Sequence, residues 1–329
     1  MKISVLGDGG WGTALAILLK NKGFDVSLWG AFKDNIEALK KDNENKKFLP
    51  GIKIPQGIFL TSDVYTACED ANLIILAIPS RFFRKVIMQN IDIFKESRAG
   101  LVSVTKGIEQ KTLKRMSEVI SEVLKERDFA VLSGPSIAPE VAKLIPTTVT
   151  VASPDGAFCR KVRDVFRTER FRVYTNDDVI GVELGGSLKN VMAIAAGISD
   201  GLGFGSNTKA ALLTRGLLEM TRLGVAMGAS QDTFKGLSGL GDLVTTCVSP
   251  VGRNRSFGEA IGKGGNPDDL LKKSAMEIEG AWTSKAALEL GRKHKIELPI
   301  TRQVYSVIFE KKSPLAAVSE LMMREPKAE

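Results

Sequence analysis

One lysine stands in an apolar stretch of this sequence, where an amine can take part in proton chemistry. Lys189 is the only lysine or arginine between Arg172 and Lys209, and small or apolar residues predominate around it in residues 181–197. Burial among such residues removes the ammonium from water, which lowers its pKa toward the range for proton exchange near neutral pH. The alternative is a lysine whose long stem carries the charge to the surface. We therefore treat Lys189 as a candidate general acid or base.

Two later segments carry polar groups that suit ligand recognition. Residues 239–247 join the carboxylate of Asp242 to neighbouring threonine hydroxyls, and residues 252–258 present Arg253 directly after a glycine. A guanidinium binds phosphate through two parallel hydrogen bonds, a geometry that a lysine lacks. Either segment alone is compatible with an ordinary loop.

A glycine-rich turn near the N-terminus indicates a dinucleotide-binding site. Gly7, Gly9 and Gly12 form the pattern G-x-G-x-x-G between a predicted strand over residues 2–6 and an apolar helix over residues 13–19. The first glycine permits a tight turn, the second lets the backbone approach the pyrophosphate, and the third allows close packing of helix on strand. The phosphates lie on free N–H groups at the helix start. A second strand about 20 residues further on makes this context specific.

The tip of that second strand bears on the choice between NAD(H) and NADP(H). The strand over residues 25–29 is followed by Gly30, and no acidic residue stands there to hold a ribose 2′-hydroxyl. Asp34 and Glu37 have the spacing of a capping box at a helix start, which favours a local role for them. Lys33 lies close enough in sequence to meet a 2′-phosphate. We therefore expect NADPH to serve at least as well as NADH.

The histidine and cysteine contents exclude several kinds of chemistry. The chain has a single histidine, His294, so a Ser-His-Asp mechanism is excluded. Its three cysteines, Cys68, Cys159 and Cys247, are far apart and form neither a CxxC pair nor a metal-ligand spacing. We interpret them as ordinary buried thiols and expect no metal site.

Charge and hydropathy narrow the class of protein further. The net charge of +8 comes from lysines and arginines that are interspersed with acidic residues along the whole chain, which is typical of a solvated surface. We expect no nucleic-acid partner, although a positive field attracts small anionic substrates. The apolar runs are far shorter than the roughly 20 residues of a membrane span, and Gly7 ends the first run before a secretory signal develops. We expect no transmembrane segment and a cytoplasmic location.

The elements that must position these residues follow an α/β pattern. Short aliphatic runs alternate with amphipathic stretches in the first half, which predicts a Rossmann-type, doubly wound parallel sheet covered by helices. We predict strands over residues 2–6, 25–29, 73–78, 101–105, 130–133 and 147–152, and residues 172–175 can add another. Beyond them the pattern is helical, so we expect a nucleotide-binding domain over residues 1–177 and an all-helical domain over residues 178–329.

Turn-forming residues directly follow most of the predicted strands. They are Gly7, Gly30, Pro79 with Ser80, Lys106 with Gly107, and Gly134 with Pro135. Ligands of doubly wound sheets bind at the carboxyl ends of the strands. We therefore expect these residues to border one shared site.

Taken together, the motifs resemble those of the bacterial NAD(P)-dependent sn-glycerol-3-phosphate dehydrogenase family over essentially the whole chain. The matching segments are residues 7–13, 105–107 and 133–136, Ala138, Glu140, Lys189 with Asn190, residues 239–242, Arg253 with Asn254, and Glu279 with Gly280. The resemblance implies an enzyme that reduces dihydroxyacetone phosphate to sn-glycerol 3-phosphate, a phospholipid backbone precursor, with NADH or NADPH. The oligomeric state is left open, with a homodimer as one option.

The resemblance also implies roles for individual residues. Lys189 looks like the general acid/base, Lys106 holds the substrate, and Asp242 pairs with a lysine and the substrate hydroxyl. Substrate contacts are implied for Lys106, Gly134, Ser136, Lys189, Asp242 and Gly252, with Thr246, Arg253 and Asn254 at the phosphate end. Cofactor contacts are expected for Gly7, Gly9, Gly10, Trp11, Gly12, Ala31, Phe32, Lys33, Lys106, Ala138, Arg253, Glu277 and Glu279.

Three positions depart from the family pattern. Asp8 stands where a small neutral residue is usual, Ala31 replaces a polar or basic residue, and Gly252 stands where serine is common. The first two bear on cofactor preference and affinity. The third removes one hydroxyl donor.

Two other classes of function compete with this interpretation. A related dehydrogenase for 3-hydroxyacids or phosphogluconate shares the combination of a Rossmann domain with a helical lysine domain, but Arg253 with Asn254 and the turn at residues 105–107 argue against it. A non-catalytic NAD(P) sensor or a basic nucleic-acid-binding protein would leave Lys106, Lys189 and Asp242 unexplained.

Overall fold

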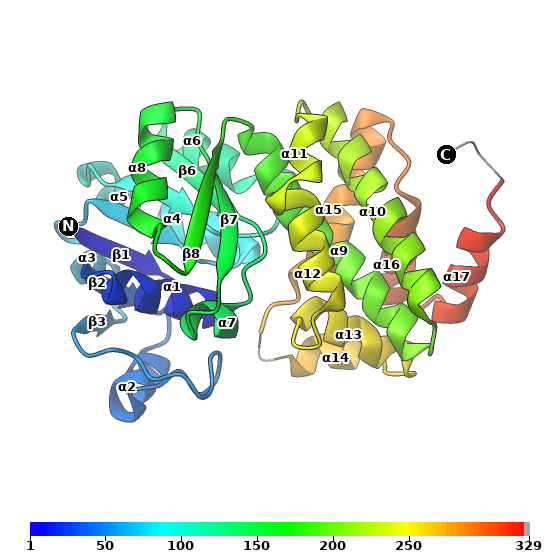
Figure 1. Ribbon diagram of the computed structural model, residues 1–329, viewed down its shortest axis with the longest axis horizontal. Helices are drawn as coiled ribbons and strands as arrows, with labels where there is room; N and C mark the ends of the chain where they lie inside the picture. The colour runs from blue at the N-terminus through cyan, green and yellow to red at the C-terminus, as the bar shows by residue number, and fades with distance from the viewer. Residues whose placement is uncertain (275, 326–329) are drawn as a thin grey trace. The chain divides into compact units, whose positions relative to one another are not determined.

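The computed structural model describes residues 1–274 and 276–325 (Figure 1). The chain divides into two compact units, of which the first comprises Met1–Lys106 with Lys114–Val182. The second comprises Gly107–Leu113 and the chain from Glu183 onward. The division falls within helix α9 (Val179–Gly201), a few residues beyond the expected boundary at residue 177. The start of α9 belongs to the first unit because Val179 and Val182 pack in a hydrophobic cluster with strand residues of the sheet.

The first unit is built on one sheet of eight strands in the order β3-β2-β1-β4-β5-β6-β7-β8. The strands are β1 (Lys2–Leu6), β2 (Asp25–Trp29), β3 (Ile58–Thr61), β4 (Leu73–Leu76), β5 (Gly100–Ser103), β6 (Phe129–Ser133), β7 (Thr147–Ala152) and β8 (Phe171–Asn176). The strands β1 to β6 pair with one another in parallel, and the order reverses between β1 and β4, as in a doubly wound fold. This confirms the expected Rossmann-type architecture.

Two details of the sheet differ from the expectation. Strand β7 runs antiparallel to β6, so the sheet is mostly rather than entirely parallel. The link between them, residues 134–146, holds only the five-residue helix α7 (Ala138–Ala142), whereas the crossover between parallel strands is usually made by a longer helix. The sequence pattern missed β3, because this edge strand buries only Ile58 fully and leaves Phe59 exposed.

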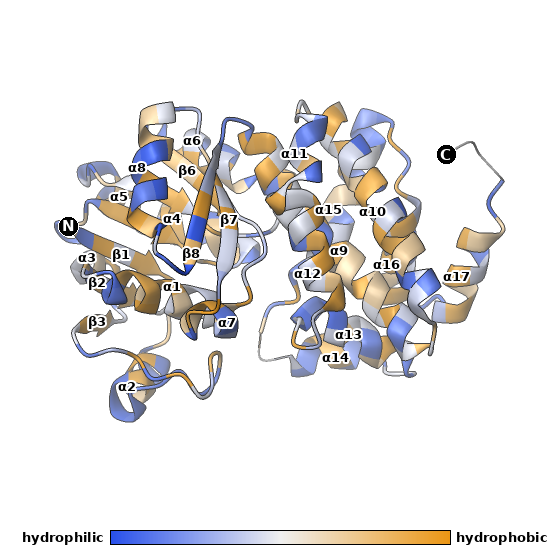
Figure 2. Cartoon of the chain, in the orientation of Figure 1, coloured by the Kyte–Doolittle hydropathy of each residue, from blue (hydrophilic) through white to orange (hydrophobic). Residues whose placement is uncertain are grey.

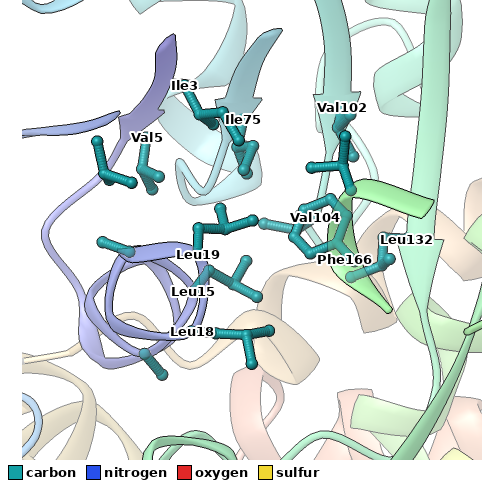
Figure 3. Packing of buried hydrophobic residues seen from close by; sticks show 14 of the residues in the cluster. Ile3, Val5, Leu15, Leu18, Leu19, Ile75, Val102, Val104, Leu132 and Phe166 are labelled. Carbon is teal, nitrogen blue, oxygen red and sulfur yellow. The ribbon is translucent and has the colours of Figure 1, made fainter. Parts of the chain in front are cut away.

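Hydrophobic layers cover both faces of the sheet, because successive residues of a strand point to opposite sides. On one face, Val5 of β1 packs with Leu15 and Leu19 of α1 (Gly10–Asn21) (Figure 3). On the other face, Leu6 of β1 lies in a cluster with Phe83 of α4 (Ser80–Gln89). Figure 2 shows the central strands mostly in orange, whereas surface helices such as α2 and α8 also carry blue residues.

The other helices of the first unit surround this sheet. They are α2 (Lys33–Asp42), α3 (Val64–Cys68), α5 (Ile91–Glu96), α6 (Met116–Leu124) and α8 (Gly156–Phe166). The capping box expected at Asp34 and Glu37 is wrong. Phe32 precedes the helix as its N-cap residue and no side chain caps the helix, while Glu37 pairs instead with Lys40. Asp34 therefore lies in the first turn of α2, past the N-cap position that Phe32 occupies.

The second unit is helical. After α9 come α10 (Ser206–Ala226), α11 (Gln231–Lys235), the π-helical turn η1 (Leu237–Gly241), α12 (Asp242–Val248), α13 (Arg253–Gly262), α14 (Pro267–Lys273), α15 (Glu279–His294), α16 (Pro299–Phe309) and α17 (Pro314–Met322). Among the described residues, α9 alone is long and apolar enough to span a membrane by length and composition. However, 89% of its most apolar window is buried within the structure, as in the core helix of a globular domain.

The three cysteines are buried free thiols, as expected. Burial raises the pKa of Cys68 to about 11 and that of Cys247 to about 12. Burial also raises the pKa of Cys159. These thiols are therefore protonated at neutral pH and unsuited to nucleophilic chemistry.

A buried glutamate ties two helices of the second unit together. Glu219 of α10 accepts hydrogen bonds from the backbone N–H groups of Ile300 and Thr301 at 2.8 and 2.9 Å, and from the Thr301 hydroxyl at 2.6 Å. These N–H groups belong to the first turn of α16, where no intrahelical acceptor exists. Glu219 thus caps α16 from outside. Burial, the largest influence, raises the pKa of its carboxyl, and the hydrogen bonds from Thr301 act in the opposite sense.

We expect Glu219→Ala to lower the free energy of unfolding by about 2–3 kcal/mol, because it leaves buried donors of α16 without an acceptor. Glu219→Gln should cost less, since one oxygen remains. A carboxyl whose pKa is raised on folding contributes most below its unfolded pKa, and this contribution declines as pH rises through the folded pKa. Urea unfolding of both variants and the parent at pH 5 and pH 8 measures the loss of stability, which should be larger at pH 5 than at pH 8 for Glu219→Ala. Equal stability of Glu219→Ala and the parent would contradict it.

Candidate active site

The glycine-rich turn after β1 has the geometry that a bound pyrophosphate requires. Gly7 has a φ of +124°, and a Cβ atom there would lie 2.3 Å from the carbonyl oxygen of Ala77. A Cβ atom on Gly12 would lie 1.9 Å from the carbonyl oxygen of Gly7, so strand and helix meet without side chains between them. Gly9, in contrast, faces open space, with no atom within 4 Å of where its Cβ would be. A ligand can therefore approach the backbone at Gly9.

Helix α1 begins at this turn with its backbone donors uncapped. Gly9 is the N-cap residue, no side chain caps the helix, and the first turn contains no acidic residue. The N–H groups of Gly10, Trp11 and Gly12 precede the first backbone hydrogen bond of the helix, which joins Thr13 to Gly9 at 2.9 Å. Within the described residues, the buried indole nitrogen of Trp11 also has no hydrogen-bond partner. These donors and the positive helix end fit a dinucleotide phosphate.

The other predicted cofactor residues of the first unit lie near this turn or past the tip of β2. Ala138, at the start of α7, has its Cβ atom 3.9 Å from the Cβ position of Gly10. Ala31, Phe32 and Lys33 follow the tip of β2 and are exposed. Phe32 is 73% exposed.

Lys106 stands at the carboxyl end of β5, beside the neighbouring strand β6. Its ammonium donates hydrogen bonds to the carbonyl oxygen of Gly134 at 2.9 Å and to the hydroxyl oxygen of Ser136 at 3.2 Å. The Ser136 hydroxyl in turn donates to the Gly134 carbonyl at 2.9 Å. Because β5 and β6 are adjacent and parallel, their ends bring these three predicted substrate contacts together. The result is a half-buried cation at the edge where doubly wound sheets bind ligands.

In the second unit, Lys189 is buried as expected, but it is paired with a carboxylate. Its Nζ atom donates to Asp242 Oδ1 at 2.6 Å, and the two side chains are only 8% and 1% exposed. Nζ also donates to the hydroxyl oxygen of Thr246, which lies 3.4 Å from Asp242 Oδ1. From the sequence we expect an isolated lysine among apolar residues, and that expectation is wrong because Asp242 is the partner of Lys189. An adjacent carboxylate favours the charged ammonium.

Local packing explains why these groups meet. Asp242 and Thr246 are four residues apart on α12 and therefore share one face of it. One turn before Lys189 on α9, a Cβ atom on Gly185 would lie 2.4 Å from the carbonyl oxygen of Ser238 in η1. The missing side chain lets α9 approach η1, which directly precedes α12. Such π-helical turns are frequent at functional sites.

Arg253 and Asn254 begin helix α13 but have different surroundings. Arg253 is exposed, and its Nη1 atom lies 3.4 Å from the carbonyl oxygen of Glu277. The preceding Gly252 is the N-cap residue and supplies no side-chain cap, so the start of α13 is open to an anion. Glu279, the remaining predicted cofactor contact of this unit, is the first residue of α15.

Asn254 is buried and joins three helices. Its amide nitrogen donates to Asn190 Oδ1 at 3.0 Å, and its Oδ1 atom accepts from the backbone N–H of Gly280 at 3.0 Å. The side chain thus holds α13 against α9 and α15. Asn190 was not among the predicted site residues, although it stands next to Lys189 in one of the segments that match the family pattern. Thr246, predicted at the phosphate end, is likewise engaged inside the unit through its contact with Lys189.

The chain matches two family models that together span most of its length. Residues 2–159 match the model of the NAD-dependent glycerol-3-phosphate dehydrogenase N-terminus, and residues 178–319 match that of the C-terminus. A relative from Thermoanaerobacter sp. (strain X514), named glycerol-3-phosphate dehydrogenase (NAD(P)+), is 50% identical over 329 residues. The alignment covers 100% of this chain and 99% of the relative. A relative of the same name from Citrifermentans bemidjiense is 48% identical and covered to 98%.

The chain is also similar to solved structures of glycerol-3-phosphate dehydrogenases. The crystal structure of glycerol-3-phosphate dehydrogenase from Coxiella burnetii matches with a TM-score of 0.95 and 41% sequence identity. The match covers 98% of this chain and 99% of that one. A ternary structure of D-mandelate dehydrogenase with NADH has a TM-score of 0.65 at 15% identity, which shows a shared fold alone.

Proposed function

Because the chain belongs to the NAD-dependent glycerol-3-phosphate dehydrogenase family, we propose that it catalyses the reversible, NAD(P)H-dependent reduction of dihydroxyacetone phosphate to sn-glycerol 3-phosphate. The reaction supplies the backbone of glycerophospholipids. The observation that carries the proposal is the buried pair of Lys189 and Asp242, because it keeps a proton donor in a fixed position. A structural ion pair would need no such burial, which costs desolvation of both charges.

The reaction requires one hydride and one proton. When bound, reduced nicotinamide supplies the hydride to the carbonyl carbon of the substrate. We assign the proton for the carbonyl oxygen to the Lys189 ammonium, which afterwards regains a proton from solvent. Asp242 and Thr246 accept hydrogen bonds from Nζ and thereby hold the ammonium in place. A positioned acid of this kind is worth about 10²- to 10⁴-fold in rate.

We assign the phosphate of the substrate to the start of α13. Arg253 supplies an exposed guanidinium there, and the uncapped helix end adds N–H donors. Asn254 acts mainly by holding the helix in place through Asn190 and Gly280. In the first unit, we assign Lys106 to substrate binding, with Gly134 and Ser136 orienting its ammonium.

We further propose that the chain acts in the cytosol as a small-molecule enzyme without a nucleic-acid partner, with a homodimer as its assembly. Lysines and arginines are interspersed with acidic residues along the chain, which supports the absence of a nucleic-acid partner. The net charge of +8 suits attraction of an anionic substrate.

A substrate panel tests the proposed reaction against its closest alternatives. In the oxidative direction, we expect NAD(P)+ reduction with sn-glycerol 3-phosphate and none above background with 3-hydroxyacids or 6-phosphogluconate. The buried Lys189 pair is compatible with all three reactions, so the panel tests the choice of substrate, which the family membership supports. Preferential oxidation of 6-phosphogluconate or a 3-hydroxyacid would contradict the proposal.

A further inference from the structure

The tip of β2 carries an acidic group after all, supplied by a different segment of the chain. Gly30 follows β2 and has no side chain, but a Cβ atom there would lie 2.3 Å from Oδ2 and 2.4 Å from Cγ of Asp8. The Asp8 carboxylate, which comes from the glycine-rich turn, therefore fills the space of the side chain at position 30. This corrects the premise that no acid stands at this tip.

Specific hydrogen bonds fix Asp8 in this place. Asn35 of α2 donates from Nδ2 to Asp8 Oδ2 at 2.5 Å. Asn45, which is fully buried, donates to the backbone carbonyl of Asp8 at 2.7 Å and to the hydroxyl of Thr13 at 2.8 Å. The turn and the carboxylate are thus braced from α2 and from the loop that follows it. A carboxylate accepts up to about four hydrogen bonds, so the one from Asn35 leaves capacity for a ligand.

An acid at this location has a defined chemical consequence in a dinucleotide-binding fold. A carboxylate at the tip of the second strand accepts a hydrogen bond from the ribose 2′-hydroxyl of NAD(H), whereas NADP(H) carries a phosphate there. A carboxylate at the tip and the 2′-phosphate of NADP(H) are both anions, so they repel each other. Lys33, the cation expected to meet a 2′-phosphate, is exposed and offers only a screened charge.

We propose that Asp8 determines cofactor choice: it accepts a hydrogen bond from the adenosine ribose 2′-hydroxyl of NAD(H) and disfavours the 2′-phosphate of NADP(H). The proposal rests on the proposed function, because it presupposes a bound nicotinamide dinucleotide. It reverses the preference expected from β2 alone. Gly30 is a necessary partner, since any side chain there would displace the carboxylate.

Binding measured without substrate tests the proposal. Isothermal titration of the whole chain with NAD+ and with NADP+ should give at least tenfold tighter binding of NAD+. In Asp8→Asn, which keeps the shape and the acceptor for Asn35 but loses the charge, NADP+ should gain about tenfold relative to NAD+. The matched control is Asp34→Asn, which removes an exposed acid from the first turn of α2 and should leave the ratio unchanged.

Three results would overturn the proposal. The first is NADP+ binding as tightly as NAD+ in the parent chain. The second is an unchanged affinity ratio in Asp8→Asn, and the third is an equal change in Asp34→Asn. If the folded parent bound neither dinucleotide, the proposed function would fail and this proposal with it. If NADP+ were merely preferred, the reaction would stand and only the role of Asp8 would be lost.

Discussion

Lys189→Ala is expected to lower kcat by about 10²- to 10⁴-fold, the usual worth of a positioned general acid. Asp242 and Thr246 fix the Lys189 ammonium, and the substitution removes the amine that we assign as the proton donor. Binding of NADH should survive, because the dinucleotide turn lies in the first unit. The measurement is steady-state kinetics with dihydroxyacetone phosphate, accompanied by NADH titration.

A matched control is Lys235→Ala. Lys235 also pairs with an aspartate, Asp232 at 2.7 Å, but both side chains are largely exposed. Exposed pairs contribute roughly 0–1 kcal/mol, so this variant should retain parental kinetics and stability. Retention of more than about a tenth of kcat in Lys189→Ala would show that the assignment is wrong, and Lys106 would be the next candidate.

The second large effect is expected at Arg253. Arg253→Ala should lower kcat/KM for dihydroxyacetone phosphate by about 30- to several-thousand-fold, because bound substrate desolvates this charged pair, and removing one partner of a desolvated pair costs on the order of 2–5 kcal/mol. Arg253→Lys should remain impaired, since an ammonium offers a point charge in place of two parallel hydrogen bonds. The exposed position of Arg253 at the open end of α13 is what makes it accessible to a substrate phosphate.

The loss at Arg253 should depend on the phosphate. Unphosphorylated dihydroxyacetone lacks the group that Arg253 is proposed to hold, so its poor turnover should change little in Arg253→Ala. The measurement is kcat/KM for both substrates in both proteins. Equal losses on the two substrates would assign Arg253 to the cofactor or to the fold, consistent with its contact with the Glu277 carbonyl.

The sequence predicted well those parts of the fold whose signal lies within a short stretch of residues. Gly7 and Gly12 stand in one short motif, and the structure shows that each is required by its immediate neighbours. Strand β4 is buried on both faces and therefore forms a continuous aliphatic run. The edge strand β3 has no such run, because most of its residues are partly or fully exposed.

The parts that the sequence did not predict depend on contacts between distant segments. Lys189 and Asp242 are 53 positions apart, so the residues around Lys189 indicate burial but not the paired carboxylate. The link between Asn254 and Asn190 spans 64 positions and leaves no local pattern. Asp8 and Gly30 show the same limit, because neither position alone indicates that the carboxylate of one fills the side-chain space of the other.

The most direct test of the proposed function is the absorbance of reduced nicotinamide with the purified chain, in the presence and absence of dihydroxyacetone phosphate. We expect a decrease in absorbance that requires both the chain and the substrate and that forms sn-glycerol 3-phosphate. Lys189→Ala should abolish most of this decrease while it still binds NADH. Cofactor binding without any substrate-dependent decrease, with NADH and with NADPH, would identify a sensor and contradict the proposed function.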